Sequence, residues 1–284
     1  MEKAIIAVVG GGTMGNGIAE VFAVAGHSVY LYDVALEIRE KALFDITDRL
    51  RRKSGRGKLS EPVEVILQRI RTVDTLDELH QAELVIEAVV ERMDVKQQIF
   101  SVLDQICSQT AILATNTSSL SITETASVTK HPERVVGMHF FNPAPVMRLV
   151  EVVAGQFTEA FVVEKVVQIA SEVGKLAIRV TDTPGFVVNR VARPFYLEAL
   201  RIAGSQVASV QAIDRIIKST GFKMGPFELQ DLIGIDVNYA VTASVYESYF
   251  QESRFRPHGL QRSMIQSGNI GKKTGRGYYS YDRQ

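Results

Sequence analysis

Cysteine is almost absent from this sequence, and metal-ligand spacings are missing as well. The 284 residues include one cysteine, Cys107, and five histidines, no two of which are spaced like a ligand pair. A single cysteine excludes an intrachain disulfide and a thiolate metal site, and it is typical of a reducing compartment. Cys107 ends a helical pattern over residues 95–107, so we expect a buried apolar residue rather than a nucleophile. No metal is predicted.

An excess of either charge is also lacking, because 32 Lys and Arg residues balance 32 Asp and Glu residues. No global field therefore attracts nucleic acid or an anionic membrane, and neither is expected as a partner. No apolar run approaches the ~20 residues that span a bilayer. The first residues enter an apolar strand directly, without the pattern of a signal or transit peptide. We expect a soluble cytoplasmic protein of one or two domains.

The first two thirds of the chain alternate strand and helix patterns. An apolar β-branched run at residues 4–9 precedes three glycines, a helical period covers residues 14–25, and a second apolar run follows at residues 27–32. Further strands are expected at 71–73, 84–90, 111–115, 135–139, 149–153 and 177–180, with helices at 95–107, 121–126 and 158–173. This alternation predicts an α/β fold, a Rossmann-type doubly wound and mostly parallel sheet.

Two further patterns complete the expected architecture. Apolar residues four apart between Ile38 and Leu50, and a helix resumed over 61–70, predict a helical hairpin inserted into the first domain. After Thr183 the strand patterns stop, except in the tail 278–281, and helical patterns occupy 187–203, 209–219, 227–250 and 260–266. We therefore predict a Rossmann-type domain over residues 1–183 and a smaller all-α domain over residues 184–284.

The segment Gly10-x-Gly12-x-x-Gly15 lies between the first strand and the first helix. This arrangement is typical of dinucleotide binding. Gly10 permits a tight turn, Gly12 lets the backbone approach a pyrophosphate, and Gly15 lets the helix pack on the strand. The helix N-terminus adds partial positive charge. We expect this loop, including Thr13 and Met14, to bind a cofactor.

Asp33 follows the second strand, where an acidic side chain can bind the ribose hydroxyls of an adenosine. Its charge would repel a 2′-phosphate, and the following Val34-Ala35 supplies no arginine to neutralise one. The predicted cofactor is therefore NAD rather than NADP. A helix cap is the alternative role for Asp33.

Oxidation of an alcohol by a nicotinamide cofactor requires a base within hydrogen-bond reach of the hydroxyl. Zinc ligands are lacking, and none of the nine tyrosines begins a Tyr-x-x-x-Lys pair, which leaves the histidines. His139 differs from the others because it ends an apolar strand, and ligands of open α/β sheets bind at the carboxyl ends of strands. His139 is the candidate base, and a buried structural histidine is the alternative.

Several longer segments match a known family pattern. They are Gly137-Met-His-Phe-Phe-Asn-Pro, Asn116-Thr-Ser-Ser-Leu, Asp182-Thr-Pro-Gly-Phe-Val-Val-Asn-Arg, Met224-Gly-Pro-Phe-Glu-Leu-Gln-Asp and Gly271-Lys-Lys-Thr-Gly-Arg-Gly-Tyr-Tyr. In this order they resemble the L-3-hydroxyacyl-CoA dehydrogenases over nearly the whole chain, most of all the bacterial 3-hydroxybutyryl-CoA dehydrogenase group. The resemblance implies reversible, NAD-dependent oxidation of a 3-hydroxyacyl-CoA, with a short acyl chain, to the 3-ketoacyl-CoA.

The resemblance also implies roles for four catalytic residues. His139 would take the hydroxyl proton during oxidation and return it during reduction. Glu151 would hold and polarise the imidazole, as a carboxylate does in hydrolase triads. Ser118 and Asn189 would hydrogen-bond the substrate oxygen and its developing charge. Without the family, Asn189 is as easily read as a helix cap.

Further residues are implied around the cofactor and coenzyme A. Asn142 would lie near the nicotinamide, and Glu91 and Lys96 near the nicotinamide ribose and the phosphates. In the basic stretch 49–58, Arg49 and Arg56 would contact the coenzyme A phosphates, with a solvated helix end as the alternative. Because the family dimerises through its helical domain, a homodimer is expected.

Two other functions fit the cofactor pattern. An NAD enzyme for a free hydroxy acid, such as a gulonate or carnitine dehydrogenase, would depart from the family around the histidine loop, which this chain keeps intact. A non-catalytic NAD-binding protein would lack His139 or Glu151, and both are present. Both alternatives are therefore less favoured than a hydroxyacyl-CoA dehydrogenase.

Overall fold

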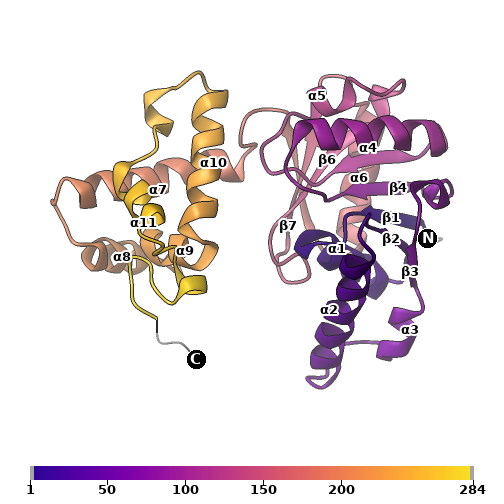
Figure 1. Cartoon of the computed structure of the whole chain (residues 1–284), viewed down its shortest axis with the longest axis horizontal. Coiled ribbons are helices and arrows are strands. Elements are labelled where there is room, and N and C mark those ends of the chain that lie inside the picture. Colours follow the sequence, from indigo (N-terminus) through magenta and orange to yellow (C-terminus); the bar gives the residue numbers. More distant parts are fainter. Residues whose placement is uncertain (1–2, 282–284) are drawn as a thin grey trace. The chain divides into compact units, whose positions relative to one another are not determined.

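The computed structural model describes residues 3–281, which belong to two units, residues 1–183 and 184–284 (Figure 1). Within the described part of the first unit lies an eight-stranded sheet with the order β3-β2-β1-β4-β5-β6-β7-β8. Its strands are β1 Ile5–Val9, β2 Ser28–Tyr32, β3 Ile70–Val73, β4 Leu84–Glu87, β5 Ile112–Thr115, β6 Val135–Phe140, β7 Leu149–Ala154 and β8 Leu176–Thr181. Neighbouring strands are parallel except β6 and β7, so the predicted mostly parallel, doubly wound sheet is confirmed.

The central strand β1 is apolar on both faces, as its sequence predicts. Ile6, Ala7, Val8 and Val9 are each at most 1% exposed, because parallel strands β2 and β4 flank β1 and helices cover the sheet. Those helices are α1 Thr13–Val24, α4 Met93–Ile106, α5 Ile122–Ala126 and α6 Ala160–Glu172, with short 3-10 turns η1 Leu76–Leu79 and η2 Pro132–Arg134. Such a sheet holds its ligands at the carboxyl ends of its strands.

The inserted hairpin consists of helix α2 Leu36–Ser54 and the short helix α3 Val63–Leu67. Ala42, Ile46 and Leu50 of α2 are buried in the same core as Val63 and Ile66 of α3. The apolar spacing thus predicted the buried face of α2 correctly at these three positions, whereas Ile38, the first apolar residue of the pattern, is 39% exposed. The helix expected over 61–70 is shorter, because Ile70 pairs with Val29 and begins strand β3.

The described part of the second unit, residues 184–281, is helical. Its helices are α7 Val188–Gly204, α8 Val210–Ser219, α9 Pro226–Ile233, α10 Ile235–Ser248 and α11 Gly259–Gln266, with 3-10 turns η3 Ser253–Phe255 and η4 Lys272–Thr274. Leu197, Leu200, Ile213 and Phe227 form its core. None of the helices among residues 3–281 combines the length and apolar character needed to span a membrane.

Two sequence expectations for this unit were wrong. The helix expected over 227–250 is two helices, because Gly234 adopts a φ of 104° that continues neither α9 nor α10. The tail expected as a strand, 278–281, contributes only one isolated bridge, Ser280 with Arg276. The backbone N–H groups of Tyr278 and Tyr279 instead donate to the buried carboxylate of Asp231.

Candidate active site

The glycine loop forms a close-packed turn between β1 and α1. Gly10 has a φ of 107°, and a Cβ there would lie 2.6 Å from the carbonyl oxygen of Ala88. A Cβ on Gly15 would lie 1.7 Å from the carbonyl oxygen of Gly10. Neither position therefore accepts a side chain. Gly10 allows the left-handed turn, and Gly15 allows α1 to begin directly against the end of β1.

Gly12 has the opposite environment. A Cβ on Gly12 would meet no atom within 4 Å, and both Gly12 and Thr13 are exposed, while Met14 is half-buried. Since α1 begins at Thr13, its first backbone N–H groups have no partner within the helix and carry partial positive charge. This open, positive helix end fits the pyrophosphate of a dinucleotide.

Asp33 lies just beyond the end of β2 and is joined to the glycine loop. Its Oδ2 accepts a hydrogen bond from Gly11 N at 2.8 Å, and its Oδ1 accepts one from Ala35 N at 3.0 Å. Helix α2 receives no side-chain cap at its N-terminus, so Asp33 does not act as a helix cap. Each carboxylate oxygen can accept a further hydrogen bond, which leaves capacity for ribose hydroxyls.

His139 and Glu151 face each other across the one antiparallel pair of strands in the described sheet. The register of β6 and β7 places the two residues directly opposite, and His139 Nδ1 lies 2.7 Å from Glu151 Oε2. The His139 side chain is 8% exposed and that of Glu151 is fully buried. A carboxylate at Nδ1 fixes the ring orientation and favours the tautomer whose lone pair is on Nε2. The pair therefore has the geometry of an oriented general base.

The loop that follows β6 connects His139 with the dinucleotide helix. Asn142 is exposed in this loop, and a Cβ on Gly17 of α1 would lie 3.1 Å from Pro145 Cδ and 3.3 Å from Ala144 Cβ. The histidine strand and the glycine loop thus end at the same edge of the sheet. On the other side of His139, the side-chain oxygen of Asn116 accepts a hydrogen bond from Phe140 N at 2.8 Å and fixes the end of β6.

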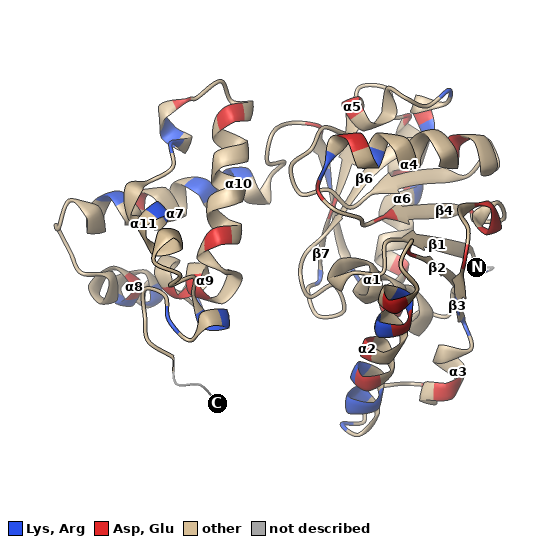
Figure 2. Cartoon of the chain, in the orientation of Figure 1, with Lys and Arg blue, Asp and Glu red and all other residues tan. Residues whose placement is uncertain are grey.

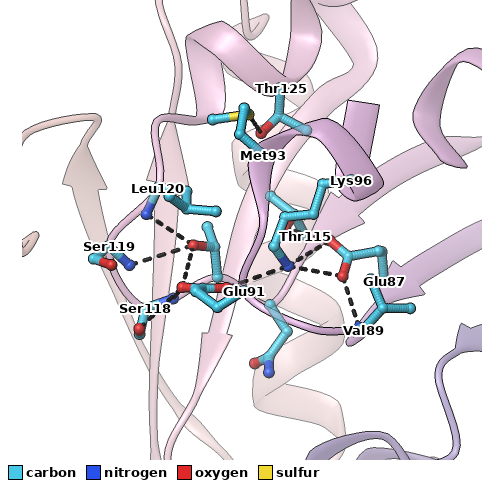
Figure 3. Close-up of polar contacts among 12 residues, drawn as sticks. Glu87, Val89, Glu91, Met93, Lys96, Thr115, Ser118, Ser119, Leu120 and Thr125 are labelled. Carbon is cyan, nitrogen blue, oxygen red and sulfur yellow. Dashed lines mark hydrogen bonds and ion pairs between the residues drawn. The ribbon is translucent and has the colours of Figure 1, made fainter. Parts of the chain in front are cut away.

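Glu91 and Ser118 meet in the loops that follow β4 and β5 (Figure 3). Glu91 Oε1 accepts hydrogen bonds from Thr117 Oγ1 at 2.7 Å, Ser118 N at 2.8 Å and Ser118 Oγ at 3.0 Å. Burial disfavours ionisation of Glu91, but the Lys96 charge and these hydrogen bonds outweigh it and hold the pKa of Glu91 below its usual range. Two residues expected near the substrate and the cofactor are therefore in direct contact.

Lys96 lies beneath this loop in an ion-pair cluster. Its Nζ is 2.8 and 2.9 Å from the two carboxylate oxygens of Glu87 and 3.3 Å from Glu91 Oε2 (Figure 3). Both Lys96 and Glu87 are fully buried. Glu87 was not predicted as a site residue, because residues 84–90 have the pattern of one apolar strand, whereas β4 ends at Glu87. A charged residue within that apolar run was the signal that could have identified it.

The two arginines assigned to coenzyme A have different environments. Arg49 donates to Glu20 Oε2 at 2.5 Å and to Asn16 Oδ1 at 2.8 Å, and Lys53 donates to the other oxygen of the fully buried Glu20 at 2.6 Å. Arg56 is exposed in the turn after α2, where Figure 2 shows basic residues gathered. Arg49 thus joins α2 to the dinucleotide helix, whereas Arg56 extends into solvent.

Asn189 lies in the second unit, as the second residue of α7, and it is half-buried. Helix α7 has no side-chain cap at Val187, and Asn189 is inside the helix, so the alternative of a capping role does not apply. Its backbone carbonyl accepts a hydrogen bond from Arg193 Nε at 3.2 Å.

Family models match both units. Residues 5–183 match the 3-hydroxyacyl-CoA dehydrogenase NAD-binding domain, and residues 185–281 match the 3-hydroxyacyl-CoA dehydrogenase C-terminal domain. The chain is 50% identical to the 3-hydroxyadipyl-CoA dehydrogenase of Escherichia coli K12 over 278 residues, which are 97% of this chain and 58% of that one. It is 43% identical to a probable 3-hydroxybutyryl-CoA dehydrogenase of Bacillus subtilis, covering 100% of this chain and 99% of the relative.

A solved structure agrees with these sequence matches. The crystal structure of a 3-hydroxybutyryl-CoA dehydrogenase from Escherichia coli K12 superposes with a TM-score of 0.97 at 48% identity, over 100% of this chain and 61% of that one. The chain therefore spans about three fifths of two of its relatives, and nearly the whole length of the Bacillus subtilis protein.

Proposed function

The chain belongs to the 3-hydroxyacyl-CoA dehydrogenase family, and we propose that it catalyses the reversible NAD-dependent oxidation of an L-3-hydroxyacyl-CoA to the 3-ketoacyl-CoA. One observation carries the proposal. The buried His139–Glu151 pair, 2.7 Å apart, lies at the sheet edge that also holds the open glycine loop. A base and a dinucleotide site at one edge are the two components that oxidation of an alcohol requires.

The cofactor would be held by the residues of the glycine loop and by Asp33. Bound there, NAD supplies the hydride acceptor for carbon 3 of the substrate. The N–H groups at the start of α1 would bind its pyrophosphate, and Asp33 would accept hydrogen bonds from its adenosine ribose. Asn142 and Glu91 are proposed to contact the nicotinamide half of the cofactor. Lys96 would affect that half only through Glu91, because its ammonium group lies between the carboxylates of Glu87 and Glu91.

In the proposed reaction His139 and Glu151 move and stabilise one proton. With Nδ1 donating to Glu151, the Nε2 lone pair takes the proton of the substrate 3-hydroxyl as the C–H bond at carbon 3 breaks. The imidazole becomes an imidazolium, and the buried charge of Glu151 stabilises it. In reduction the same proton returns to the oxygen. Ser118 would hydrogen-bond that oxygen, and the role expected for Asn189 stays a prediction.

The acyl group is proposed to be short, with 3-hydroxybutyryl-CoA as the reference substrate. A relative of matching length and a solved structure carry that name. The relative with 50% identity is named for a 3-hydroxyadipyl-CoA, whose acyl chain ends in a second carboxylate. An acyl-CoA with a terminal carboxylate is therefore the second candidate substrate.

Coenzyme A is proposed to contact the basic stretch at the end of α2. Arg56 is the stronger candidate because it is exposed, whereas Arg49 would have to bind a phosphate while it is ion-paired with Glu20.

We also propose a homodimer through the helical unit. The apolar side chains of Val191, Val207, Phe222 and Phe250 in this unit are 56–96% exposed. Size-exclusion chromatography with light scattering tests the dimer.

The proposed activity is tested by comparing three substrates in the direction of NADH oxidation. Acetoacetyl-CoA should be turned over, and free acetoacetate should be a poor substrate. The rate with 3-ketoadipyl-CoA tests whether an acyl-CoA with a terminal carboxylate is also a substrate. Equal rates with free acetoacetate would instead identify a hydroxy-acid dehydrogenase. No turnover of any of the three would favour a non-catalytic NAD-binding protein.

A further inference from the structure

Glu87 ends β4 beneath the active-site loops and is used by no step of the proposed reaction. Its Oε1 accepts hydrogen bonds from Val89 N at 2.7 Å and Lys96 Nζ at 2.8 Å, and its Oε2 accepts from Lys96 Nζ at 2.9 Å and Thr115 Oγ1 at 2.7 Å. A carboxylate offers about four acceptor positions, so these donors saturate it. Fully buried and saturated, Glu87 cannot itself bind substrate or cofactor.

Lys96 connects the buried Glu87 with the partly exposed Glu91. An ammonium group has about three N–H donors, and the neighbours of Lys96 Nζ are the two oxygens of Glu87 and Oε2 of Glu91. A buried ammonium is strongly unfavourable unless it is paired, so Lys96 stays between the two carboxylates. The carboxylate of Glu91, whose side chain is 38% exposed, is thereby held at one position from below.

Glu91 in turn holds the turn that follows β5. Three hydrogen bonds from Thr117 and Ser118 reach its Oε1, and one of them comes from the Ser118 hydroxyl. Thr117 Oγ1 also accepts hydrogen bonds from Ser119 N at 3.3 Å and Leu120 N at 2.9 Å. The backbone and the hydroxyl of Ser118 are therefore oriented by the side chain that Lys96 fixes (Figure 3).

We propose that Glu87 is a positioning residue that orients Ser118 through Lys96 and Glu91. The inference rests on the proposed function only in so far as Ser118 contacts the substrate. Both carboxylate oxygens of Glu87 accept hydrogen bonds from donors. A glutamine at this position would therefore place its NH2 group against an N–H or O–H donor, whichever way its amide is oriented. It would also leave Lys96 with Glu91 as its only charged partner in the cluster. Lys96 and Glu91 then shift together, and the Ser118 turn loses its fixed support.

The first test is backbone hydrogen exchange at Ser118 in the cofactor-free protein. Glu87→Gln should accelerate exchange of the Ser118 amide, which donates to Glu91, roughly tenfold. Asp104→Asn is the matched control, because Asp104 is also a buried carboxylate with a cationic partner, Arg134 at 2.8 Å, and it lies in helix α4 together with Lys96. The control should leave Ser118 exchange unchanged. Unchanged exchange in Glu87→Gln, or equal acceleration in Asp104→Asn, would overturn the proposal.

The second test is a double-mutant cycle on kcat with acetoacetyl-CoA. Glu87→Gln should lower kcat roughly tenfold in the native background and hardly at all in a Ser118→Ala background, because Glu87 acts through Ser118. Losses that multiply in the double variant would show a general structural role and reject the inference. If the chain turns over no acyl-CoA at all, the proposed function fails, and the exchange measurement still decides the role of Glu87.

If Glu87→Gln does not fold, Thr115→Val tests the same chain of contacts with a smaller change. Thr115→Val keeps the shape of the β5 residue and removes one donor to Glu87 Oε2. It should accelerate Ser118 exchange by about threefold, a smaller effect than the loss of the Glu87 charge. Unaltered Ser118 exchange in a folded Thr115→Val protein would count against the proposed chain of contacts.

Discussion

Replacement of Glu151 by glutamine is the perturbation whose size follows most directly from the structure. Glutamine keeps the volume and can still accept from His139 Nδ1, which lies 2.7 Å from Glu151 Oε2, but it removes the buried negative charge. A hydrogen bond to a charged group contributes ~1.5–3 kcal/mol and a neutral one ~0.5–1.5 kcal/mol, so about 1–2 kcal/mol of support for the imidazolium is lost. Since ~1.4 kcal/mol is tenfold in rate, kcat should fall roughly 5- to 30-fold.

The assay is steady-state reduction of acetoacetyl-CoA followed by NADH consumption, together with NADH affinity measured by titration. NADH affinity should stay within about twofold of the native value, because Glu151 contacts the histidine and not the glycine loop. Thermal unfolding of the variant separates loss of folded protein from loss of rate. A folded Glu151→Gln enzyme with native kcat would refute the argument that this carboxylate supports the base.

Four further predictions concern the cofactor site, the basic stretch, the buried thiol and Glu91. Asp33→Ala should lower the preference for NAD over NADP in kcat/KM, because ribose hydrogen bonds and a charge that repels a 2′-phosphate are lost, and an unaltered preference would exclude Asp33 as the ribose ligand. Arg56→Ala should raise KM for acetoacetyl-CoA and weaken the salt dependence of KM more than Arg49→Ala does, since exposed charges are screened over ~8–10 Å; equal effects would contradict the different roles of the two arginines. Burial raises the pKa of Cys107 to about 11, so alkylation at pH 8 should require unfolding, and rapid labelling of the native protein would show that the thiol is accessible. The pKa of Glu91 is lowered in the folded state, so it contributes stability above the ordinary glutamate pKa that is lost as pH falls through the folded value. Glu91→Gln should flatten the loss of thermal stability in acid, and an unaltered acid profile would exclude this contribution.

Much of the fold could be predicted from the sequence because its signals are local. The apolar run of β1, the glycines at its end and the period of α1 follow one another between Ile5 and Val24, and each segment has a residue pattern that predicts its own conformation. The period of Ala42, Ile46 and Leu50 likewise identified the buried face of α2. Where a local signal competed with a long-range partner, the prediction was wrong, as at Ile70, which pairs with Val29 in the sheet.

The contacts within the site were less predictable because they join distant segments. Contact between His139 and Glu151 was predicted, but their direct opposition depends on β7 running antiparallel to β6, which the alternation of strands and helices did not indicate. The partners of Lys96 and Arg49 were missed entirely. Glu87 and Glu20 are buried carboxylates on other elements, and no periodicity specifies which cation reaches them.

The role of His139 as the catalytic base is tested by the rate of NADH-dependent reduction of acetoacetyl-CoA, measured for the native chain and for His139→Gln under identical conditions. The native chain should reduce the thioester, and the variant should be slower by roughly 10²–10⁴-fold, the usual contribution of a general base. NADH affinity should be the same in both proteins, because His139 lies near the end of β6, whereas the proposed cofactor site is the loop Gly10–Gly15. A His139→Gln protein that reduces acetoacetyl-CoA at the native rate would contradict the assignment of His139 as the catalytic base.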